Sequence, residues 1–425
     1  MSRIPSLLSI RARHDSALNC PLAVMLSLTC ILAGCGAISR RPSPLVDRPD
    51  VAPVGFSREI RWSHEETRQE FLLRTAAMAE RWKSLAAGRR LKFLALSGGG
   101  SGGAFGAGVL VGWSEQGTRP QFDAVTGVST GALLAPFAFL GPKWDPELRK
   151  AFSGLANKPF LRSTWIGTVF GTSAFKGSPL RELVERFVTP ELLSAVAAES
   201  AKGRILLVST TDLDRDQIVV WNMGLIAATG GTRARSLFRD VLVASASVPG
   251  VFPPVMIRVE GPAGTFDEMH VDGGTKTSLV AMPDIGAVID NDLGPMEHAD
   301  IYVLINGKLG STPVTTRLGT LSVLKRSVAG NLKAGARSSI LMAYSFALRH
   351  SMSVRATAIA EEYPFAGPLD FSPETMQGLF DYGFRCAVSG EVWDDPLAVL
   401  DRSSRRGQPA EGTRPGCPAM GGSSR

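Results

Sequence analysis

A serine between two glycines lies where a short apolar strand is expected to turn into a helix. Residues 127–131 read Gly-Val-Ser-Thr-Gly, after an expected buried strand at Phe122–Thr126 and before the apolar run Ala132–Leu140. A G-x-S-x-G turn in this context holds a serine hydroxyl at the edge of a sheet, where it can act as a nucleophile. Gly127 and Gly131 fit because bulky neighbours would collide with the strand and the helix.

A nucleophilic Ser129 needs a base, and the sequence offers an aspartate more readily than a histidine. The downstream histidines His270, His298 and His350 do not lie in a glycine-flanked turn after a late strand. Asp272 ends an expected strand, Met269–Asp272, and precedes Gly273 and Gly274. Side chains at such strand ends project into active-site crevices. Taken alone, Asp-Gly-Gly is also the sequence of a plain turn.

A second glycine-rich loop, residues 97–103, follows the expected first strand, Leu91–Leu96. Gly98, Gly100 and Gly103 satisfy the G-x-G-x-x-G dinucleotide pattern, but the acidic Asp123 precedes the second strand, whereas the ribose-binding acid should end it. The other interpretation is an oxyanion hole, in which glycines turn their N–H groups toward one point without blocking the substrate. The loop therefore favours acyl-transfer chemistry over nucleotide binding.

Strands and helices are expected to alternate along the chain, which predicts a parallel or mixed sheet with helices on both faces. The remaining expected strands are Arg204–Ser209 and Ile301–Ile305, and the expected helices are Ala104–Gln116, Lys176–Val188, Glu191–Ala201, Ser236–Ala246, a mostly helical Thr320–Ala360 and a helix from Ser372 through Phe384.

Four motifs in this order resemble those of patatin-like phospholipases. They are the glycine triplet 98–100 before a helix, the serine pentapeptide 127–131, the stretch 244–254 (ASASVPGVFPP), and the Asp-Gly-Gly at 272–274. The resemblance covers about half of the chain and implies a three-layer α/β/α sandwich with a mixed, mainly parallel central sheet.

The resemblance also assigns roles to residues. It implies a Ser–Asp dyad in which Ser129 is the nucleophile and Asp272 the base, with the N–H groups of Gly99, Gly100 and Ser101 forming the oxyanion hole. The family usually carries Arg or Lys at the second position after the glycine triplet, where this chain has Gly102. That departure leaves the dyad intact and weakens a specific preference for phospholipids over other esters.

The expected function is therefore hydrolysis of lipid acyl esters through an acyl-enzyme, without a cofactor or metal. Two alternatives stay open. A histidine-dependent α/β-hydrolase would use Ser129 with His298 or His350 as its base. A non-catalytic envelope lipoprotein would keep the motifs as a degenerate site.

Composition narrows the class of protein. The chain has 425 residues, 44% of them hydrophobic, and a formal charge of +7. Neither a long basic run on an expected recognition helix nor aromatic-basic interleaving occurs, so nucleic acid is not an expected partner. The five cysteines form no C-x-x-C pair, and Cys386 and Cys417 either pair in an oxidising compartment or are free thiols.

The N-terminus reads as a targeting segment. Arginines precede an apolar stretch, Pro21–Ile31, which ends in Leu32-Ala33-Gly34-Cys35. This order resembles the lipobox of bacterial lipoproteins, and it implies lipidation of Cys35 and a membrane-anchored protein of the cell envelope. Gly36, where an Asp would suggest inner-membrane retention, points to the outer membrane.

The expected organisation has six parts, listed in chain order. They are a signal peptide at 1–34, a proline-rich tether at 35–56, an N-terminal helix at 57–90, the catalytic core at 91–310, a C-terminal helical part of the same domain at 311–401 and a disordered tail at 402–425.

Overall fold

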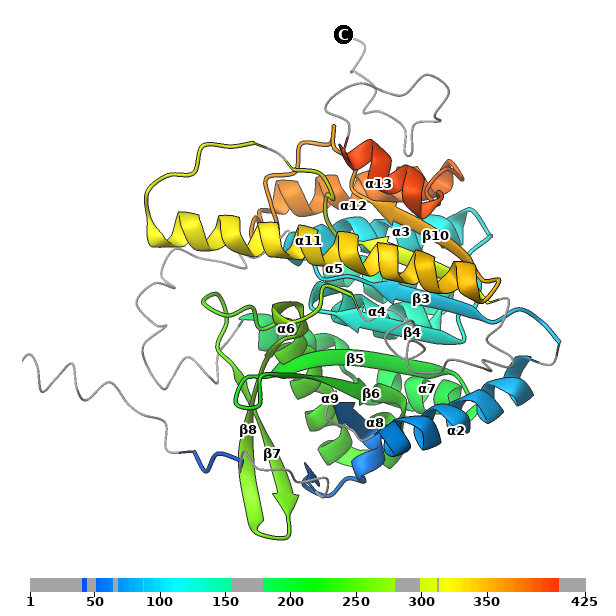
Figure 1. Ribbon diagram of the computed structural model, residues 1–425, viewed down its shortest axis with the longest axis vertical. Coiled ribbons are helices and arrows are strands. Elements are labelled where there is room, and N and C mark those ends of the chain that lie inside the picture. The colour runs from blue at the N-terminus through cyan, green and yellow to red at the C-terminus, as the bar shows by residue number, and fades with distance from the viewer. Residues whose placement is uncertain are drawn as a thin grey trace, which may run out of the picture.

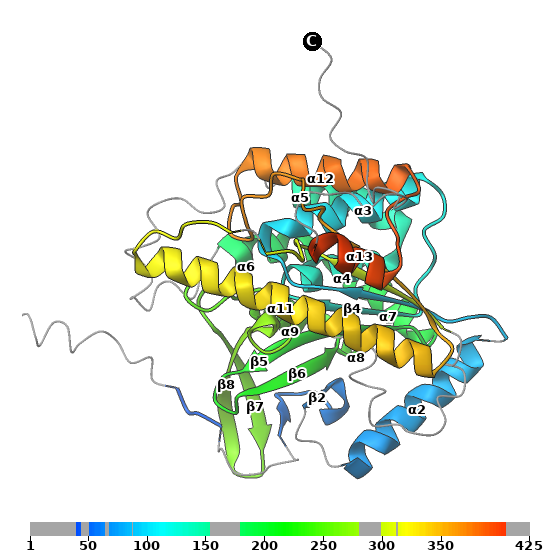
Figure 2. The same ribbon diagram turned by 45° about the horizontal axis from the view of Figure 1, so that its top comes forward.

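A computed structural model of the chain describes residues 40–43, 51–63, 68–86, 88–153, 179–279, 299–311 and 313–404. These residues build one mixed sheet with helices on both of its faces (Figures 1 and 2). The predicted signal peptide, Cys35 and the end of the predicted tail lie outside the described residues.

The sheet has a parallel centre and an antiparallel extension. Strands β10, β9, β3, β4 and β5 lie side by side and run parallel. Strands β8, β7 and β1 continue from β5 in antiparallel pairs, and β6 pairs with β5 and β2. The bounds of the strands are β1 Ala52–Pro53, β2 Arg61–Ser63, β3 Lys92–Leu96, β4 Ala124–Val128, β5 Ile205–Asp212, β6 Gln217–Asn222, β7 Val255–Gly261, β8 Gly264–Asp272, β9 Asp300–Ile305 and β10 Ser353–Ala358.

Helices cover the sheet in two outer layers. The bounds of the helices are α2 Arg68–Ala86, α3 Gly103–Glu115, α4 Thr130–Leu140, α5 Asp145–Ser153, α6 Pro179–Phe187, α7 Pro190–Ala201, α8 Met223–Thr229, α9 Gly231–Ser245, α11 Thr320–Arg349, α12 Pro373–Val388 and α13 Pro396–Ser404. Helices α2, α11 and α13 pack on one face, and α3 to α9 with α12 pack on the other.

Strand β3 shows why the sheet has a core on each side. Side chains alternate between faces along a strand, so its apolar residues divide between two layers. Leu94 and Leu96 belong to the core under α3 and α4, whereas Phe93 and Ala95 belong to the core under α2 and α11. A strand buried on both faces is typical of a parallel sheet. The predicted fold class, a three-layer α/β/α sandwich with a mixed, mainly parallel central sheet, is confirmed.

Several helices begin at capping residues that the sequence makes recognisable. Thr189 accepts the N–H of Leu192 at the start of α7, and Ser372 accepts the N–H of Thr375 at the start of α12. In both helices a proline occupies the first turn, where its missing N–H costs nothing. The predicted helix from Ser372 therefore begins where expected, and it continues to Val388.

Three details of the predicted organisation are corrected by the structure. The region Thr320–Ala360 is helical only to Arg349, because Ser353–Ala358 forms strand β10 beside β9. The predicted tether is partly fixed on the sheet, since Ala52 and Pro53 form β1. Helix α13 extends to Ser404 and so includes the first residues of the predicted tail.

Cys386 is fully buried on α12 and is disulfide-bonded. The alternative of a free thiol at this position is therefore wrong. Within the part of the chain that the structure describes, no helix combines the length and the apolar character needed to cross a bilayer.

Candidate active site

Ser129 and Asp272 lie in direct contact although 143 residues separate them in the sequence. The Ser129 hydroxyl donates a hydrogen bond of 2.6 Å from Oγ to Asp272 Oδ2. Both residues are buried, with 5% and 3% of their surfaces exposed. A serine hydroxyl bound to a carboxylate at this distance is arranged for proton transfer between the two groups.

Strand β5 brings the two residues together. Its first half pairs with β4, where Val128 lies opposite Ser209, and its second half pairs with β8, where Asp272 lies opposite Thr210. Strand β6 occupies the other edge of β5 along both halves. Strands β4 and β8 therefore run toward each other along one edge of β5. The residue that ends β8 meets the residue that follows β4.

The turn at Ser129 has the strained geometry of a nucleophile elbow. Ser129 has φ = 55° and ψ = −125°, a conformation that L-residues rarely adopt. A Cβ at Gly127 would lie 2.5 Å from the Gly131 carbonyl oxygen, and one at Gly131 would lie 2.3 Å from that of Leu96. Neither position has room for a side chain, so the two glycines permit the sharp turn from β4 into α4.

Helix α9 and the loop after it hold both members of the pair. The Ser245 hydroxyl accepts the backbone N–H of Ser129 at 3.0 Å, and the Ser247 carbonyl oxygen accepts the N–H of Asp272 at 3.0 Å. Both serines are buried. Both serines belong to the stretch 244–254, one of the four motifs that resemble those of patatin-like phospholipases. The sequence alone did not indicate what these two serines do.

Burial makes Asp272 an unusually strong base for a carboxylate. Desolvation raises the pKa of Asp272 to about 7, although the hydrogen bonds from the Ser129 hydroxyl and the Gly274 N–H act in the opposite direction. The Gly274 N–H donates to Oδ1 at 2.6 Å and so fixes the carboxylate plane. A pKa near neutrality suits a general base at physiological pH.

The glycine loop lies beside Ser129, and its amides differ in their partners. A Cβ at Gly98 would lie 3.2 Å from Ser129 Cβ. Within the described residues, the N–H groups of Gly99 and Gly100 have no hydrogen-bond partner. The Ser101 N–H instead donates to the Pro368 carbonyl oxygen at 2.9 Å. The expectation that Ser101 offers an oxyanion-hole amide therefore needs correction, because its N–H is already bonded within the protein.

Asn306, the residue that follows β9, explains why residue 102 is a glycine. A Cβ at Gly102 would lie 2.0 Å from the carbonyl oxygen of Asn306. Asn306 is fully buried and is held by Ser97, whose Oγ accepts its backbone N–H and whose carbonyl oxygen accepts its side-chain amide. A long cationic side chain at position 102 would have to displace this backbone, so the departure from the family pattern has a steric cause.

The two histidines after Ser129 that the structure describes, His270 and His350, contact groups other than the Ser129 hydroxyl. His270 is fully buried on β8, with Nδ1 2.9 Å from Thr210 Oγ1 and Nε2 3.2 Å from Glu268 Oε2. The ring of His350 packs against Phe346 at the end of α11. His298 lies outside the described residues. The side chain that accepts the hydrogen bond of the Ser129 hydroxyl is thus the Asp272 carboxylate.

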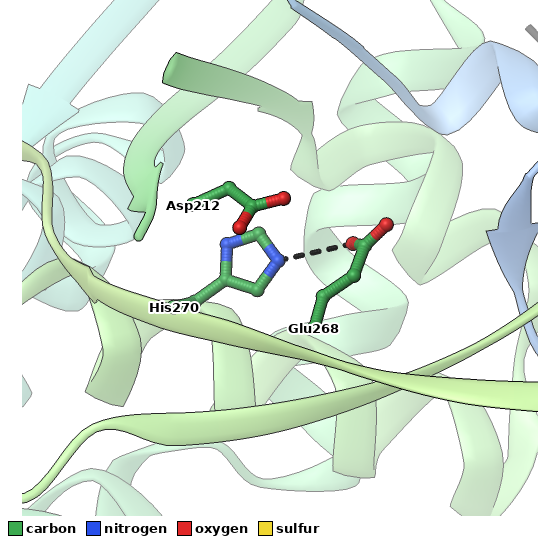
Figure 3. A group of neighbouring side chains, drawn as sticks. All are labelled: Asp212, Glu268 and His270. Carbon is green, nitrogen blue, oxygen red and sulfur yellow. Dashed lines mark hydrogen bonds and ion pairs between the residues drawn. The ribbon is translucent and has the colours of Figure 1, made fainter. Parts of the chain in front are cut away.

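Asp212, Glu268 and His270 form a buried cluster beside the active site (Figure 3). One donor atom from each lies within 4.8 Å of the others, so the cluster has the composition of a metal site. Burial favours a higher pKa for Glu268, but the Arg61 guanidinium and His270 together hold that pKa below its usual range. With Arg61 bound to both carboxylate oxygens and both His270 nitrogens partnered, the cluster is a satisfied hydrogen-bond network.

Asp123 has a structural role at the opposite end of the parallel strands. Its carboxylate accepts two hydrogen bonds from the Arg89 guanidinium, at 2.8 and 2.6 Å, and one from the Lys92 N–H. It precedes β4 and so lies far from the glycine loop, which rules it out as a ribose ligand for that loop.

Comparison with known families identifies this part of the chain. Residues 94–285 match the family model described as patatin-like phospholipase, and the match includes the glycine loop, Ser129 and Asp272. The chain therefore contains a patatin-like phospholipase domain.

Solved structures with similarity to parts of this chain include the following three. VipD from Legionella pneumophila is 14% identical with a TM-score of 0.32 over 74% of this chain and 67% of its own. Human GIVD cytosolic phospholipase A2 is 13% identical with a TM-score of 0.29 over 66% and 51% of the two chains. ExoU in complex with SpcU, from Pseudomonas aeruginosa, is 16% identical with a TM-score of 0.25 over 61% and 53%.

This chain thus spans about half of the length of the last two proteins. No curated protein matches the sequence.

Proposed function

We propose that this protein is a lipid acyl-ester hydrolase that uses Ser129 as its nucleophile and Asp272 as its base. The observation that carries the proposal is the buried 2.6 Å hydrogen bond between the two side chains, at a strained elbow beside a glycine loop. The match of residues 94–285 to patatin-like phospholipases supports a lipid ester as the substrate.

Acylation begins when Ser129 Oγ attacks the ester carbonyl carbon. Asp272 Oδ2 takes the hydroxyl proton through the existing hydrogen bond, so no side chain has to move. The Gly99 and Gly100 amides, together with the N-terminus of α4, stabilise the tetrahedral oxyanion. Asp272 then gives its proton to the departing alcohol, which leaves an acyl group on Ser129.

Deacylation repeats these steps with water. Asp272 removes a proton from the attacking water, the glycine-loop amides again hold the oxyanion, and the fatty acid departs as Oγ regains its proton. A carboxylate with its usual pKa would be a weak base for this work. The pKa of about 7 that burial gives Asp272 brings its basicity close to the working pH.

The test is hydrolysis of a panel of phospholipids and simple esters by wild type and matched variants. Ser129→Ala and Asp272→Asn are each expected to lower kcat/KM by roughly 10²–10⁴-fold on every substrate that wild type cleaves. Ser236→Ala is the control and should keep full activity, because Ser236 is a half-buried serine in the first half of α9 that binds Arg239 and is not one of the site residues. Retention of esterase activity by Ser129→Ala would refute the proposal.

The same panel separates the dyad from a histidine-dependent hydrolase. His270→Gln, His298→Gln and His350→Gln should each keep kcat/KM within a few-fold of wild type, provided that circular dichroism shows a folded protein. A loss in one histidine variant equal to that of Asp272→Asn would favour a histidine base.

We further propose that the protein is an envelope lipoprotein anchored through lipid on Cys35. The charged segment, apolar run and lipobox-like sequence before Cys35 support this location, and a disulfide at Cys386 suits an oxidising compartment. In cells fed labelled palmitate, the wild-type protein and the Cys30→Ser variant should incorporate the label, whereas the Cys35→Ser variant should not. Equal labelling of Cys35→Ser would contradict the anchor.

A further inference from the structure

Helix α11 runs beside the Ser129–Asp272 pair. A Cβ at Gly98 would lie 3.2 Å from Ser129 Cβ and 3.7 Å from Leu332 Cδ2. A Cβ at Gly274 would lie 2.9 Å from Asp272 Oδ1 and 3.4 Å from the same Leu332 atom. The inward side of α11 at Leu332 therefore lies next to both members of the pair.

The opposite side of α11 is exposed along the length of the helix. An α-helix has 3.6 residues per turn, so residues four or seven apart lie on the same side of it. Leu341 follows Leu332 by about two and a half turns and so points the other way. We call the exposed row that contains Leu341 the outer face of α11, and it consists of Val323, Gly330, Ala334, Leu341 and Leu348.

Exposed large apolar side chains are concentrated on this helix and on residues 313–319, which precede it. Of the ten such side chains in the described residues, six lie between 314 and 348. They are Val314, Leu318, Val323, Leu341, Met342 and Leu348, and Leu318 is completely exposed. Single exposed apolar residues are ordinary on a protein surface, but a concentration along one side of one helix indicates a binding surface.

The same part of the chain carries only positive charge. Residues 301–360 contain eight of the 46 Lys and Arg residues and none of the 39 Asp and Glu residues, so the rest of the chain, with 38 and 39, is almost neutral. Arg317 and Arg349 are exposed near the two ends of α11. Arg337 donates to the Ser403 hydroxyl, a neutral partner that leaves its charge in place.

We propose that the outer face of α11 and residues 313–319 bind the surface of a membrane that contains anionic lipids, an inference that rests on the lipid hydrolase proposed above. A helix with an apolar row and flanking arginines is suited to the boundary between head groups and acyl chains. Anionic head groups attract the basic residues. Because a helix with its side chains is about 10–12 Å across, a docked α11 holds the Ser129–Asp272 pair within about that distance of its substrate.

Other occupants of the outer face fit the observations less well. A second copy of the chain would place one basic, acid-free helix against another, and like charges across an interface are unfavourable. A nucleic acid would match the charge of the arginines, but its phosphate backbone offers no apolar contact to Leu341 or Leu348. A lipid surface supplies both the negative charge and the apolar layer.

The first experiment reports which surface of the protein touches vesicles. Each full-length protein carries Ser129→Ala, so that lipid is not consumed, and Cys35→Ser, so that no lipid is attached. An environment-sensitive fluorescent amino acid replaces either Ser338, which is exposed beside the outer face, or Thr229, which is exposed at the end of α8 on the other face of the sheet. Vesicles of phosphatidylcholine and phosphatidylglycerol in equal parts should shift the emission of the probe at 338 to the blue and leave the probe at 229 unchanged. Phosphatidylcholine alone should give a smaller shift.

The second experiment identifies the residues that bind, by sedimentation with the same mixed vesicles. Leu341→Asp should weaken vesicle binding by about tenfold or more, because it places a charge in the apolar row. The double variant Arg317→Glu, Arg349→Glu should lose the preference for phosphatidylglycerol. Val388→Asp is the matched control, since Val388 is 42% exposed against 46% for Leu341 and ends α12 on the other face of the sheet.

The outcomes separate this inference from the catalytic proposal, because vesicle binding is measured without hydrolysis. If the protein cleaves no ester but the probe at 338 responds as expected, the surface is supported and the catalytic proposal fails. If the protein with Ser129 intact cleaves esters, Leu341→Asp should keep its kcat/KM for soluble p-nitrophenyl butyrate and cleave mixed vesicles at least about tenfold more slowly.

Three results would overturn the membrane surface. One is a probe at 338 that does not respond to mixed vesicles. Another is equal vesicle binding by Leu341→Asp and Val388→Asp. The third is a dimer in analytical ultracentrifugation that Leu341→Asp abolishes, together with no response to vesicles, which would assign the outer face to a second copy of the chain.

Discussion

Replacing Asp272 with asparagine is expected to abolish activity and, at neutral pH, to stabilise the protein. Asparagine has nearly the same shape, so its Oδ1 can accept the Gly274 N–H and its amide can donate to Ser129 Oγ. What changes is the charge. The wild-type carboxylate is buried and lacks a cationic partner among the groups that shift its pKa, so its ionised form is disfavoured in the folded state.

The size of the effect follows from the pKa. Burial moves the pKa of Asp272 from 3.8 to about 7, a difference of about three units. At 1.36 kcal/mol per unit, ionisation of Asp272 lowers the free energy of unfolding by up to about 4 kcal/mol. The folded state holds the proton more tightly than the unfolded state, so wild-type stability falls as pH rises from about 4 to about 7.

Urea unfolding of wild type and Asp272→Asn over a pH series measures this difference. The two proteins should have similar free energies of unfolding below about pH 3, where Asp272 is neutral in both the folded and the unfolded state. As pH rises, the free energy of unfolding of Asp272→Asn should increasingly exceed that of wild type. This difference should become constant above about pH 8. A stability difference that does not change with pH would refute the reasoning that Asp272 is a desolvated carboxylate with a raised pKa.

Three further predictions follow from the same structure. The wild-type pH profile of kcat/KM for a neutral ester should rise through about pH 7 as the base loses its proton, and a flat profile between about pH 5 and pH 9 would contradict this. Gly102→Ala should lower stability by roughly 1–3 kcal/mol in urea unfolding, because its Cβ would meet the Asn306 oxygen, whereas Gly307→Ala, which has open space, should not. Arg61→Met should cost roughly 3–5 kcal/mol in the same assay by leaving Glu268 buried without its cation, and adding Glu268→Gln should restore most of the loss.

The sequence was sufficient for the parts of the site that depend on local structure. The glycines around Ser129 predicted a sharp strand-to-helix turn, and the structure has that turn with φ = 55° at the serine. The apolar runs predicted the buried central strands, because a strand covered on both faces needs apolar residues throughout. The alternation of strands with helices predicted the layers.

Contacts between segments that are distant in the sequence could not be predicted from local sequence patterns. Strand β10 has few large apolar side chains and follows a long helix, so its sequence was predicted to be part of that helix. It forms a strand because it pairs with β9. Nothing in the spacing of Ser129 and Asp272 indicates that β4 and β8 converge on one edge of β5. Propensity is a weak predictor where tertiary pairing decides.

In the glycine loop, the sequence also could not show which N–H groups are free to bind a substrate. The glycine run predicted N–H groups near the nucleophile, but the distant Pro368 carbonyl oxygen accepts the Ser101 N–H. Ser245 and Ser247 bind the backbone of the dyad through partners that the fold alone brings near. Their motif was visible in the sequence, while their role required the structure.

The most direct measurement of the central claim is the rate and position of labelling by a fluorophosphonate, which reacts with activated serines. Mass spectrometry should find the label on Ser129 in the folded wild-type protein, and Asp272→Asn should react at least about a hundredfold more slowly because its serine has lost its base. A label on another residue, or equal rates for the two proteins, would contradict the account.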